Sequence, residues 1–243
     1  NVEVNGQKLG IMLLEEHFSK ELLERHKRKE GVIVKFNETL FWKSLLLNNG
    51  DVKLHKPSIN PFKHYTNSNI GVFSKTKVNK SDNLRGQYSL AVSMLRSFVE
   101  GDVKPSEVFD VKMMGSYLAI TSFFKAGHDT LFNNQRFYLN PLTLKIEPVP
   151  YDANVGYDIT VTGQPIVNKI LKDPKIKKVF NKVLNKLNTD FSNDKYTQNI
   201  KIKEAVYLNQ LKTEFYFLEG FDYSLVGDCS GLTNTNFPVY IHA

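Results

Sequence analysis

An almost wholly apolar segment near the middle of the chain most constrains the fold. Residues 109–129, FDVKMMGSYLAITSFFKAGHD, carry apolar side chains around most of a helical circumference. Such a helix is stable only when it is buried, so other elements have to cover it. Asp110 stands in front of the helical run and is a typical N-cap residue. The segment delivers His128 and Asp129 at its C-terminal end.

The residues after this helix alternate between polar and apolar types. Residues 133–152, NNQRFYLNPLTLKIEPVPYD, predict a β-hairpin whose turn is NPLT. Helical spacing resumes beyond Gly163, and a second helix is predicted within residues 200–217. The apolar positions of the first of these helices fall on one face: Ile176, Val179, Phe180, Val183, Leu184 and Leu187.

The N-terminal part is richer in strand signals. Residues 2–16 predict a hairpin that turns at Asn5-Gly6, a dipeptide suited to positive φ. A helix with Ser19 as N-cap is expected to follow and to end at Gly31. The next segment, GVIVKF, predicts a short buried strand with Lys35 near its end.

A polar, irregular segment separates this part from the central helix. Residues 37–80 contain Pro and Asn without a sustained period and predict a long loop or insertion. Residues 83–102 have helical spacing and end at Gly101. The sequence therefore predicts an α+β protein in two lobes, a small strand-rich part over 1–102 and a mostly helical part over 103–243.

Composition excludes several classes of protein. The chain has 243 residues, enough for one large domain or two small lobes. No apolar run approaches the roughly 20 residues of a membrane-spanning helix, so no membrane span is expected. A single cysteine, Cys229, excludes a disulfide framework and a cysteine-based zinc site. Because the chain begins with Asn1 and without a signal peptide, we expect an N-terminal segment to be missing.

The formal charge of +7 invites a nucleic-acid interpretation. The lysines are spread along the chain, however, and the densest stretches have the pattern of solvated helix faces. No RNA-binding signature, zinc finger or Arg-rich tract accompanies them. Nucleic acid is therefore not the expected partner, and attraction to anionic substrates or surfaces fits the charge equally well.

The polar hairpin carries a spacing that is typical of phosphoryl transfer. Asp129 and Asn134 form an Asp-x4-Asn pair in DTLFNN, and Asp152 follows after a hairpin-sized interval. A carboxylate that orients an acceptor hydroxyl and oxygen ligands for Mg²⁺ are what this chemistry requires. The spacing alone favours a plainer interpretation, in which the two aspartates cap turns and the asparagine begins the hairpin. Both interpretations stay open at this point.

Several collinear segments resemble the CotH kinase family, the spore-coat type of secreted protein-kinase-like enzymes. Residues 128–158 resemble its core, in which an Asp, an Asn ahead of a Tyr-Leu pair, a turn and Pro-Trp-Asp-x-Asp follow an apolar helix. Residues 4–36 are similar to its Asn-Gly hairpin, helix and strand, and residues 165–187 to a later helix. The match spans residues 3 to about 190, with an unmatched insertion near 45–85.

The resemblance assigns roles to the polar residues of the hairpin. It implies that Asp129 is the catalytic aspartate and that Asn134, or its neighbour Asn133, is a metal-binding asparagine. Asp152 would be the metal-chelating aspartate.

The resemblance also suggests nucleotide-binding residues in the N-terminal part. Lys35 and either Glu15 or Glu16 are the implied lysine and acid that orient the nucleotide phosphates. Further basic strands normally precede this hairpin in the family, so the phosphate-binding lysine could also lie outside the chain.

Two residues depart from the family pattern. Tyr151 replaces a Trp, which keeps an aromatic ring, whereas Asn154 replaces an acid and removes a negative charge beside the metal. The resemblance therefore implies a two-lobed, atypical protein-kinase-like fold with a truncated N-terminal part. The implied function is Mg²⁺-dependent transfer of the ATP γ-phosphoryl group to Ser or Thr of a coat or surface protein. We expect it outside the cell or on a cell or spore surface. The alternative is a non-catalytic pseudokinase that serves as a structural, coat or surface-adhesion protein.

Overall fold

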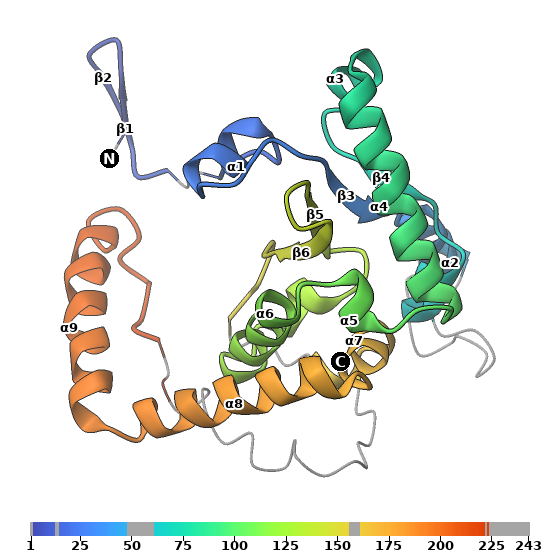
Figure 1. Cartoon of the computed structure of the whole chain (residues 1–243). Helices are drawn as coiled ribbons and strands as arrows, with labels where there is room; N and C mark the ends of the chain where they lie inside the picture. Colours follow the sequence, from blue (N-terminus) through green and yellow to red (C-terminus); the bar gives the residue numbers. More distant parts are fainter. Residues whose placement is uncertain (1, 13–14, 48–60, 156–160, 222, 224–243) are drawn as a thin grey trace.

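The protein is an α+β structure built around a four-stranded antiparallel sheet (Figure 1). The computed structural model describes residues 2–12, 15–47, 61–155, 161–221 and 223. Cys229 and the central part of the expected insertion, residues 48–60, lie outside the described residues. Among the described helices, none combines the length and the apolar character needed to cross a membrane.

The predicted N-terminal hairpin is confirmed. Strands β1 (Val2–Val4) and β2 (Gln7–Gly10) pair through a turn in which Asn5 has φ 53° and Gly6 has φ 81°. Such positive φ values are the reason that an Asn-Gly dipeptide marks this kind of turn. The hairpin protrudes from the body in Figure 1. It is linked to the C-terminal region by the Glu214 carboxylate, which accepts from the Ile11 amide at 2.8 Å.

The first helix is shorter than the sequence predicts. Helix α1 spans Lys20–Arg25 with Ser19 at its N-cap position, and it does not reach Gly31. The chain turns at Lys27, which has φ 56°, and the Arg28 amide donates back to the Leu23 carbonyl. The expectation that Gly31 ends this helix was wrong, because a left-handed lysine ends it first.

The central sheet joins segments that are a hundred residues apart. Its order is β4 (Ile70–Val72), β3 (Ile33–Phe36), β5 (Arg136–Asn140) and β6 (Lys145–Val149), and every pair is antiparallel. The predicted buried strand and the predicted hairpin are both present, and the hairpin pairs directly with that strand. In the β3–β5 register Ile33 lies opposite Tyr138 and Val34 opposite Phe137.

Residues 37–80 are more regular than predicted. They contain α2 (Thr39–Leu47), a 3-10 helix η2 (Pro61–Thr66), strand β4 and α3 (Lys75–Lys80). Asn37 was counted as a loop signal, but its side chain accepts from the Thr39 amide at 2.8 Å at the start of α2. Strand β4 is only three residues long and is held by its pairing with β3, so local sequence carries little sign of it.

One face of the sheet packs on the helical layer. The predicted long helix is α4 (Asp82–Glu100), which ends at Gly101 with φ 92°, and the predicted apolar helix is α6 (Val111–Phe123). Asp110 caps α6 by accepting from the Met113 amide at 2.8 Å. The other helices, which Figure 1 shows around and below the sheet, are α5 (Pro105–Val108), α7 (Pro165–Leu171), α8 (Pro174–Phe191) and α9 (Asp194–Leu211).

Helix α8 has the amphipathic pattern that was predicted. Ile176, Phe180 and Leu184 are buried, while Lys178 and Lys182 are exposed. These lysines form the solvated face of a packed helix.

The central sheet and the hydrophobic core each contain residues from both predicted parts, 1–102 and 103–243. Strand β3 pairs with β5, and one hydrophobic core contains Val34 and Phe36 together with Leu118 and Phe180. The α+β class is confirmed. The division into parts 1–102 and 103–243 stays a prediction.

The contact between α6 and α8 generates the first testable prediction. A Cβ added at Gly115 would lie 2.7 Å from the Val179 Cβ, whereas one added at Gly86 on α4 meets nothing within 4 Å. We expect Gly115→Ala to lower the free energy of unfolding by about 1–3 kcal/mol through overpacking. Gly86→Ala should raise it by about 0.5–1 kcal/mol through helix propensity. Urea unfolding of both variants measures the two signs, and equal effects would contradict this account of the helix contact.

Candidate functional site

Asp129 is a buried carboxylic acid at the end of the apolar helix. It lies in the 3-10 turn η3 (Gly127–Thr130), and only 2% of the residue is exposed. The Tyr117 hydroxyl, from α6, donates to the Asp129 backbone carbonyl at 3.1 Å. Within the described part of the chain, the Asp129 Oδ1 atom is buried and has no hydrogen-bond partner. A buried acceptor left in this way costs free energy unless a ligand satisfies it.

Burial also changes the acidity of this group. Desolvation raises the pKa of Asp129 to about 7, the nearby Tyr117 hydroxyl opposes that rise, and the negative charge of Asp152 adds to it. Desolvation acts because the ionised form loses its hydration in the protein interior. Asp129 and Asp152 are therefore close enough for the two carboxyl groups to interact electrostatically.

His128 joins two of the predicted site residues, Asn134 and Asp152, into one cluster with Asn154. Its Nδ1 atom lies 3.0 Å from Asp152 Oδ2, 3.1 Å from Asn134 Nδ2 and 3.3 Å from Asn154 Nδ2. The Asn134 amide also donates to the His128 carbonyl at 3.0 Å. When Nδ1 carries a proton, it donates to the Asp152 carboxylate. When Nδ1 is unprotonated, it accepts from the side-chain amides of Asn134 and Asn154. The structure thus brings Asn134 and Asp152 together although 18 residues separate them in the sequence.

The segment that carries Asp152 has an unusual backbone. Asp152 and Asn154 have φ values of 54° and 44°, in the left-handed backbone region that residues other than glycine rarely adopt. Such conformations persist only where surrounding contacts hold them, and they gather at functional sites. Here the contacts of both side chains with His128 help to hold the segment.

The oxygen donors of the cluster suit a hard divalent cation. Asn133 Oδ1, like Asp129 Oδ1, is buried without a partner among the described residues, and Asn133 Nδ2 donates to Asn134 Oδ1 at 3.4 Å. Carboxylate and amide oxygens are the ligands that Mg²⁺ takes. No group of three His, Cys, Asp or Glu residues suited to a metal occurs in the described ranges, so amide oxygens have to complete the set. The candidate magnesium ligands, Asp152 with Asn134 or Asn133, are therefore of the residue types that fit this ion.

Arg136 lies beneath this cluster at the start of β5. It is 6% exposed, and its Nη1 atom donates to the carbonyls of Asn133 at 2.7 Å and Gln135 at 3.2 Å. Its guanidinium carbon lies 4.5 Å from the Tyr151 ring centre. Burial lowers the pKa of Arg136, and the carboxylates of Glu38 and Asp152 act in the opposite direction.

Lys35 is paired with an acid that the sequence did not single out. Its Nζ atom lies 3.0 Å from Glu38 Oε1, and the Trp42 indole donates to Glu38 Oε2 at 3.0 Å. Glu16 forms an ion pair with Arg25 at 2.8 Å, and Glu15 is exposed on the chain before α1. In the structure, therefore, Glu38 is the partner of Lys35, and Glu15 and Glu16 lie with α1.

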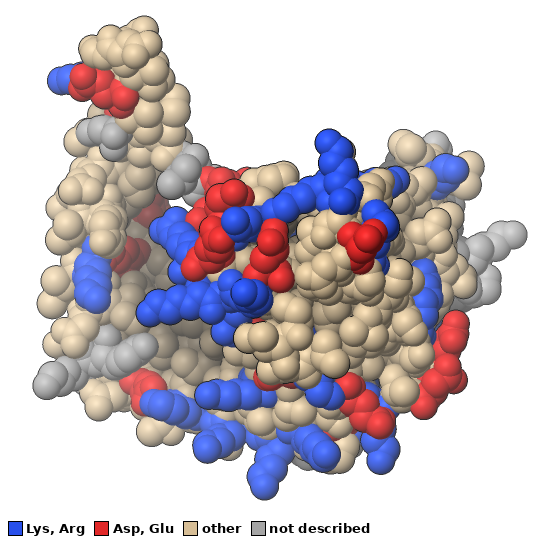
Figure 2. Space-filling model, turned by 45° about the horizontal axis from the view of Figure 1, so that its top comes forward, with Lys and Arg blue, Asp and Glu red and all other residues tan. Residues whose placement is uncertain are grey.

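A cleft of about 750 Å³ runs from α1 along β6 to Asp152. Its walls include Glu15, Glu16, Arg28 and Met113. This volume lies within the range of small-molecule sites. Figure 2 shows acidic and basic side chains interleaved over the upper part of the molecular face, with Lys and Arg prevailing along its lower edge.

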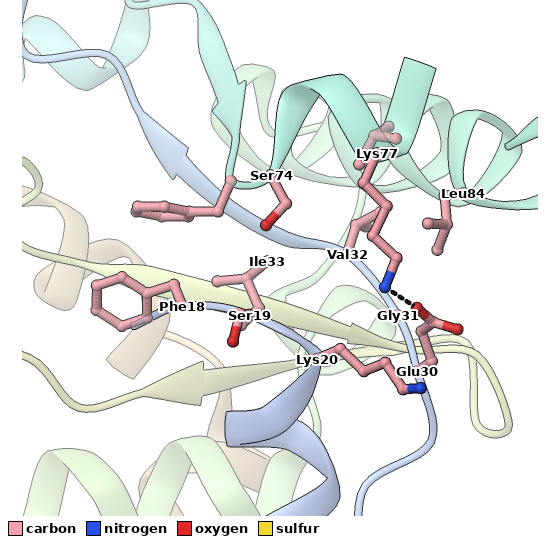
Figure 3. Close-up of a pocket in the computed structure, with 12 residues that line it drawn as sticks. Phe18, Ser19, Lys20, Glu30, Gly31, Val32, Ile33, Ser74, Lys77 and Leu84 are labelled. Carbon is pink, nitrogen blue, oxygen red and sulfur yellow. Dashed lines mark hydrogen bonds and ion pairs between the residues drawn. The ribbon is translucent and has the colours of Figure 1, made fainter. Parts of the chain in front are cut away.

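A second cavity, between α1, β3 and α3, is much smaller. Figure 3 shows Phe18, Glu30 and Lys77 on its walls, with Lys77 and Glu30 forming an ion pair. Its volume of about 30 Å³ holds about one water molecule and excludes a nucleotide. The larger cleft is therefore the one with room for a ligand beside the polar cluster.

These features describe a protein with a buried acid, a mixed carboxylate and amide cluster and an adjoining cleft. The family model described as "CotH kinase protein" matches residues 1–227. The chain belongs to the CotH kinase family. Comparisons with curated proteins and with solved structures found no match.

Glu38 and Arg136 were not foreseen, and His128 was not among the predicted site residues. Glu38 follows Lys35 by three residues within a stretch that was interpreted as a loop, so the spacing was visible but its context was not. Arg136 stands inside the predicted hairpin, where a basic residue usually faces solvent. An inward-facing position in the alternating strand was the only available signal.

The pKa of Asp129 generates a prediction on stability. In the unfolded chain an Asp titrates near 3.9, and in the native protein at about 7. The contribution of Asp129 to stability is therefore fully present below pH 4 and is lost as pH rises to 7. We expect Asp129→Asn to stabilise the protein more at pH 8 than at pH 5, by about 3 kcal/mol, because the native pKa of about 7 lies two units above pH 5. Denaturant unfolding of both proteins at the two pH values measures this, and a pH-independent difference would refute it.

Proposed function

We propose that the protein is a CotH-like atypical protein kinase that transfers the ATP γ-phosphoryl group to Ser or Thr of a partner protein. The observation that carries this proposal is the convergence of Asn134 and Asp152 on His128, directly beside the buried Asp129. Family membership supports a kinase-type activity that uses ATP and a metal ion. A two-lobed, kinase-like arrangement of parts 1–102 and 103–243 belongs to the same proposal.

Asp129 would orient the acceptor hydroxyl and take its proton. The hydroxyl oxygen forms a bond to the γ-phosphorus while the bond from that phosphorus to the ADP oxygen breaks, and the proton passes to the carboxylate. A base works best when its pKa lies near the working pH, which a pKa of about 7 satisfies. Burial thus supports the role that the motif implies.

Asn134 and Asp152 would hold magnesium, with Asn133 as the alternative amide ligand. The bound ion supplies positive charge that neutralises the phosphate oxygens during transfer. The two unpartnered oxygens, Asp129 Oδ1 and Asn133 Oδ1, are the atoms whose hydrogen-bonding capacity is unused. Their unused lone pairs support binding of the acceptor hydroxyl at Asp129 and of the ion at Asn133.

Lys35 would bind the nucleotide phosphates, and Glu38 would orient it. The pair is 3.0 Å apart, and both side chains are about two-thirds buried. A strand lysine paired with a nearby glutamate is the arrangement that protein kinases use for this purpose. The proposal thus gives Glu38 the role that was expected of Glu15 or Glu16.

The expected partner and place of action belong to this proposal as well. A coat or surface protein supplies the Ser or Thr acceptor, and the kinase acts outside the cell or on a cell or spore surface. The net charge of +7 is consistent with attraction to anionic ligands such as ATP.

The alternative is a pseudokinase with a structural, coat or adhesion role. Asn154 favours it, because this amide replaces an acid of the family pattern and lies 3.3 Å from His128 Nδ1 instead of offering a charge. Binding of Mg²⁺ and ATP separates the two functions, since a ligand of the native state raises the unfolding temperature.

Two substitutions test the transfer activity. We expect Asp129→Ala and Asp152→Ala each to lower the rate of phosphate incorporation from labelled ATP by at least about a hundredfold, because each removes a charged group from the reacting centre. Asp102→Ala, at an exposed position after α4, is the matched control and should keep the wild-type rate.

The same proteins are then heated with and without nucleotide. The wild type should gain about 5–10 °C at a hundredfold excess of ATP over its Kd, and only when Mg²⁺ is present. Nucleotide binding without transfer would identify the pseudokinase. Unchanged transfer in either Asp variant would contradict the assigned role.

The assignment of Glu38 has its own test. We expect Glu38→Gln to raise the KM for ATP about tenfold, because Lys35 loses the charge that holds it. Glu16→Gln should leave that KM unchanged, since its ion pair is with Arg25. Initial rates over a range of ATP concentrations measure both, and the reverse result would restore the original assignment.

A further inference from the structure

The geometry points to Arg136 as the positioning residue that holds the two ligand-bearing segments of the candidate site in register. This inference rests on the proposed function, because the segments concerned carry the proposed magnesium ligands. Arg136 itself would touch neither the ion nor the substrate. It would act through the residues beside it.

The hydrogen bonds of Arg136 go to the loop before β5. Its Nη1 atom donates to the carbonyls of Asn133 and Gln135, which flank Asn134 on both sides. The backbone N–H of Asn134 also stabilises this loop, because it donates to the Leu131 carbonyl at 2.8 Å. One guanidinium therefore fixes the backbone on either side of the metal-binding asparagine.

The guanidinium lies over aromatic rings from three other segments. Its carbon lies 4.5 Å from the ring centre of Tyr151 and 5.7 Å from those of Phe18 and Phe73. Tyr151 directly precedes Asp152. A planar, delocalised cation stacks on such rings in a way that an ammonium group does not.

The remaining rings connect Arg136 to the nucleotide-binding candidates. The Phe73 ring is shared with Lys35, whose Nζ atom lies 5.8 Å from its centre. The β3–β5 register, continued by one pair, also brings Lys35 and Arg136 opposite each other on one face of the sheet. Phe18 follows Glu16 by two residues. Arg136 thus contacts residues beside the asparagines and Asp152, and it shares the Phe73 ring with Lys35.

The burial of this cation calls for a reason beyond packing. Among the described residues Arg136 forms no ion pair, and its buried Nε atom has no hydrogen-bond partner. A buried charge without a paired carboxylate is costly, and an apolar residue of similar size would fill the space at lower cost. The left-handed Asp152 and Asn154 supply the reason, because a strained segment needs outside contacts to keep its shape.

Arg136→Lys tests the inference while it keeps the charge. A lysine cannot bond both carbonyls and stack on Tyr151 at once. We expect the Mg²⁺ concentration that gives half-maximal ATP binding to rise about tenfold, with the ATP affinity at saturating Mg²⁺ changed much less. Amide hydrogen exchange in the metal-free protein should accelerate together in residues 133–135 and 151–155.

Lys169→Met is the matched control. Lys169 also places a cation over an aromatic ring, 5.5 Å from the centre of Phe98, and donates to the Val99 carbonyl, but it lies on α7. This variant should change neither the Mg²⁺ midpoint nor the exchange of the two segments. A double-mutant cycle of Arg136→Lys with Tyr151→Leu should be non-additive in the Mg²⁺ midpoint.

The outcomes separate this inference from the proposed function. If the wild type binds no Mg²⁺ and ATP, the proposed function fails, and the exchange data still decide whether Arg136 couples the two segments. Wild-type exchange and an unchanged Mg²⁺ midpoint in Arg136→Lys would overturn the inference. Equal effects from Lys169→Met would overturn it as well, because they would show a general loss of stability.

Discussion

The pairing of β3 with β5 is the interaction on which the rest of the structure depends. It joins residues 33–36 to the hairpin a hundred residues later and buries Val34 and Phe137 in a shared core. Without this ladder the Lys35–Glu38 pair and the His128 cluster would belong to unconnected segments. With it, one sheet face carries the phosphate-binding candidates next to the segment that bears Asp152. Pairing β3 with β5 closes a long loop and costs conformational entropy. The burial of apolar side chains between helices and both faces of the sheet offsets this cost.

Burial then gives the site its chemical character. The apolar helix α6 ends inside the protein, so the acid that follows it cannot remain hydrated, and the pKa of Asp129 rises to about 7. The same burial leaves Asp129 Oδ1 and Asn133 Oδ1 without partners in the described structure. In the proposed function, a bound cation or acceptor hydroxyl would offset this cost. Stability and the proposed function are then opposed at this position, as they often are at sites built for catalysis.

The backbone conformation of the segment that carries Asp152 is a second source of unfavourable free energy at the candidate site. Asp152 and Asn154 adopt left-handed conformations, and both His128 and Arg136 contact the segment that carries them. The Asn at position 154 tolerates such a backbone better than most residues do. The replacement of the family acid therefore has a conformational as well as an electrostatic consequence.

The sequence by itself determined the elements whose pattern is local: the apolar helix, the amphipathic α8, the Asn-Gly hairpin and the polar hairpin with its Asp and Asn residues. These follow from periodicity and capping, which act over a few residues. Only the tertiary structure decided that Glu38 pairs with Lys35, that β4 forms at all and that Arg136 points inward under Tyr151. The reason is physical, since a three-residue strand and a buried cation are stable only through partners that lie far away in the chain. Sequence spacing could therefore identify the candidate site residues, whereas tertiary packing determined which residues hold them in place.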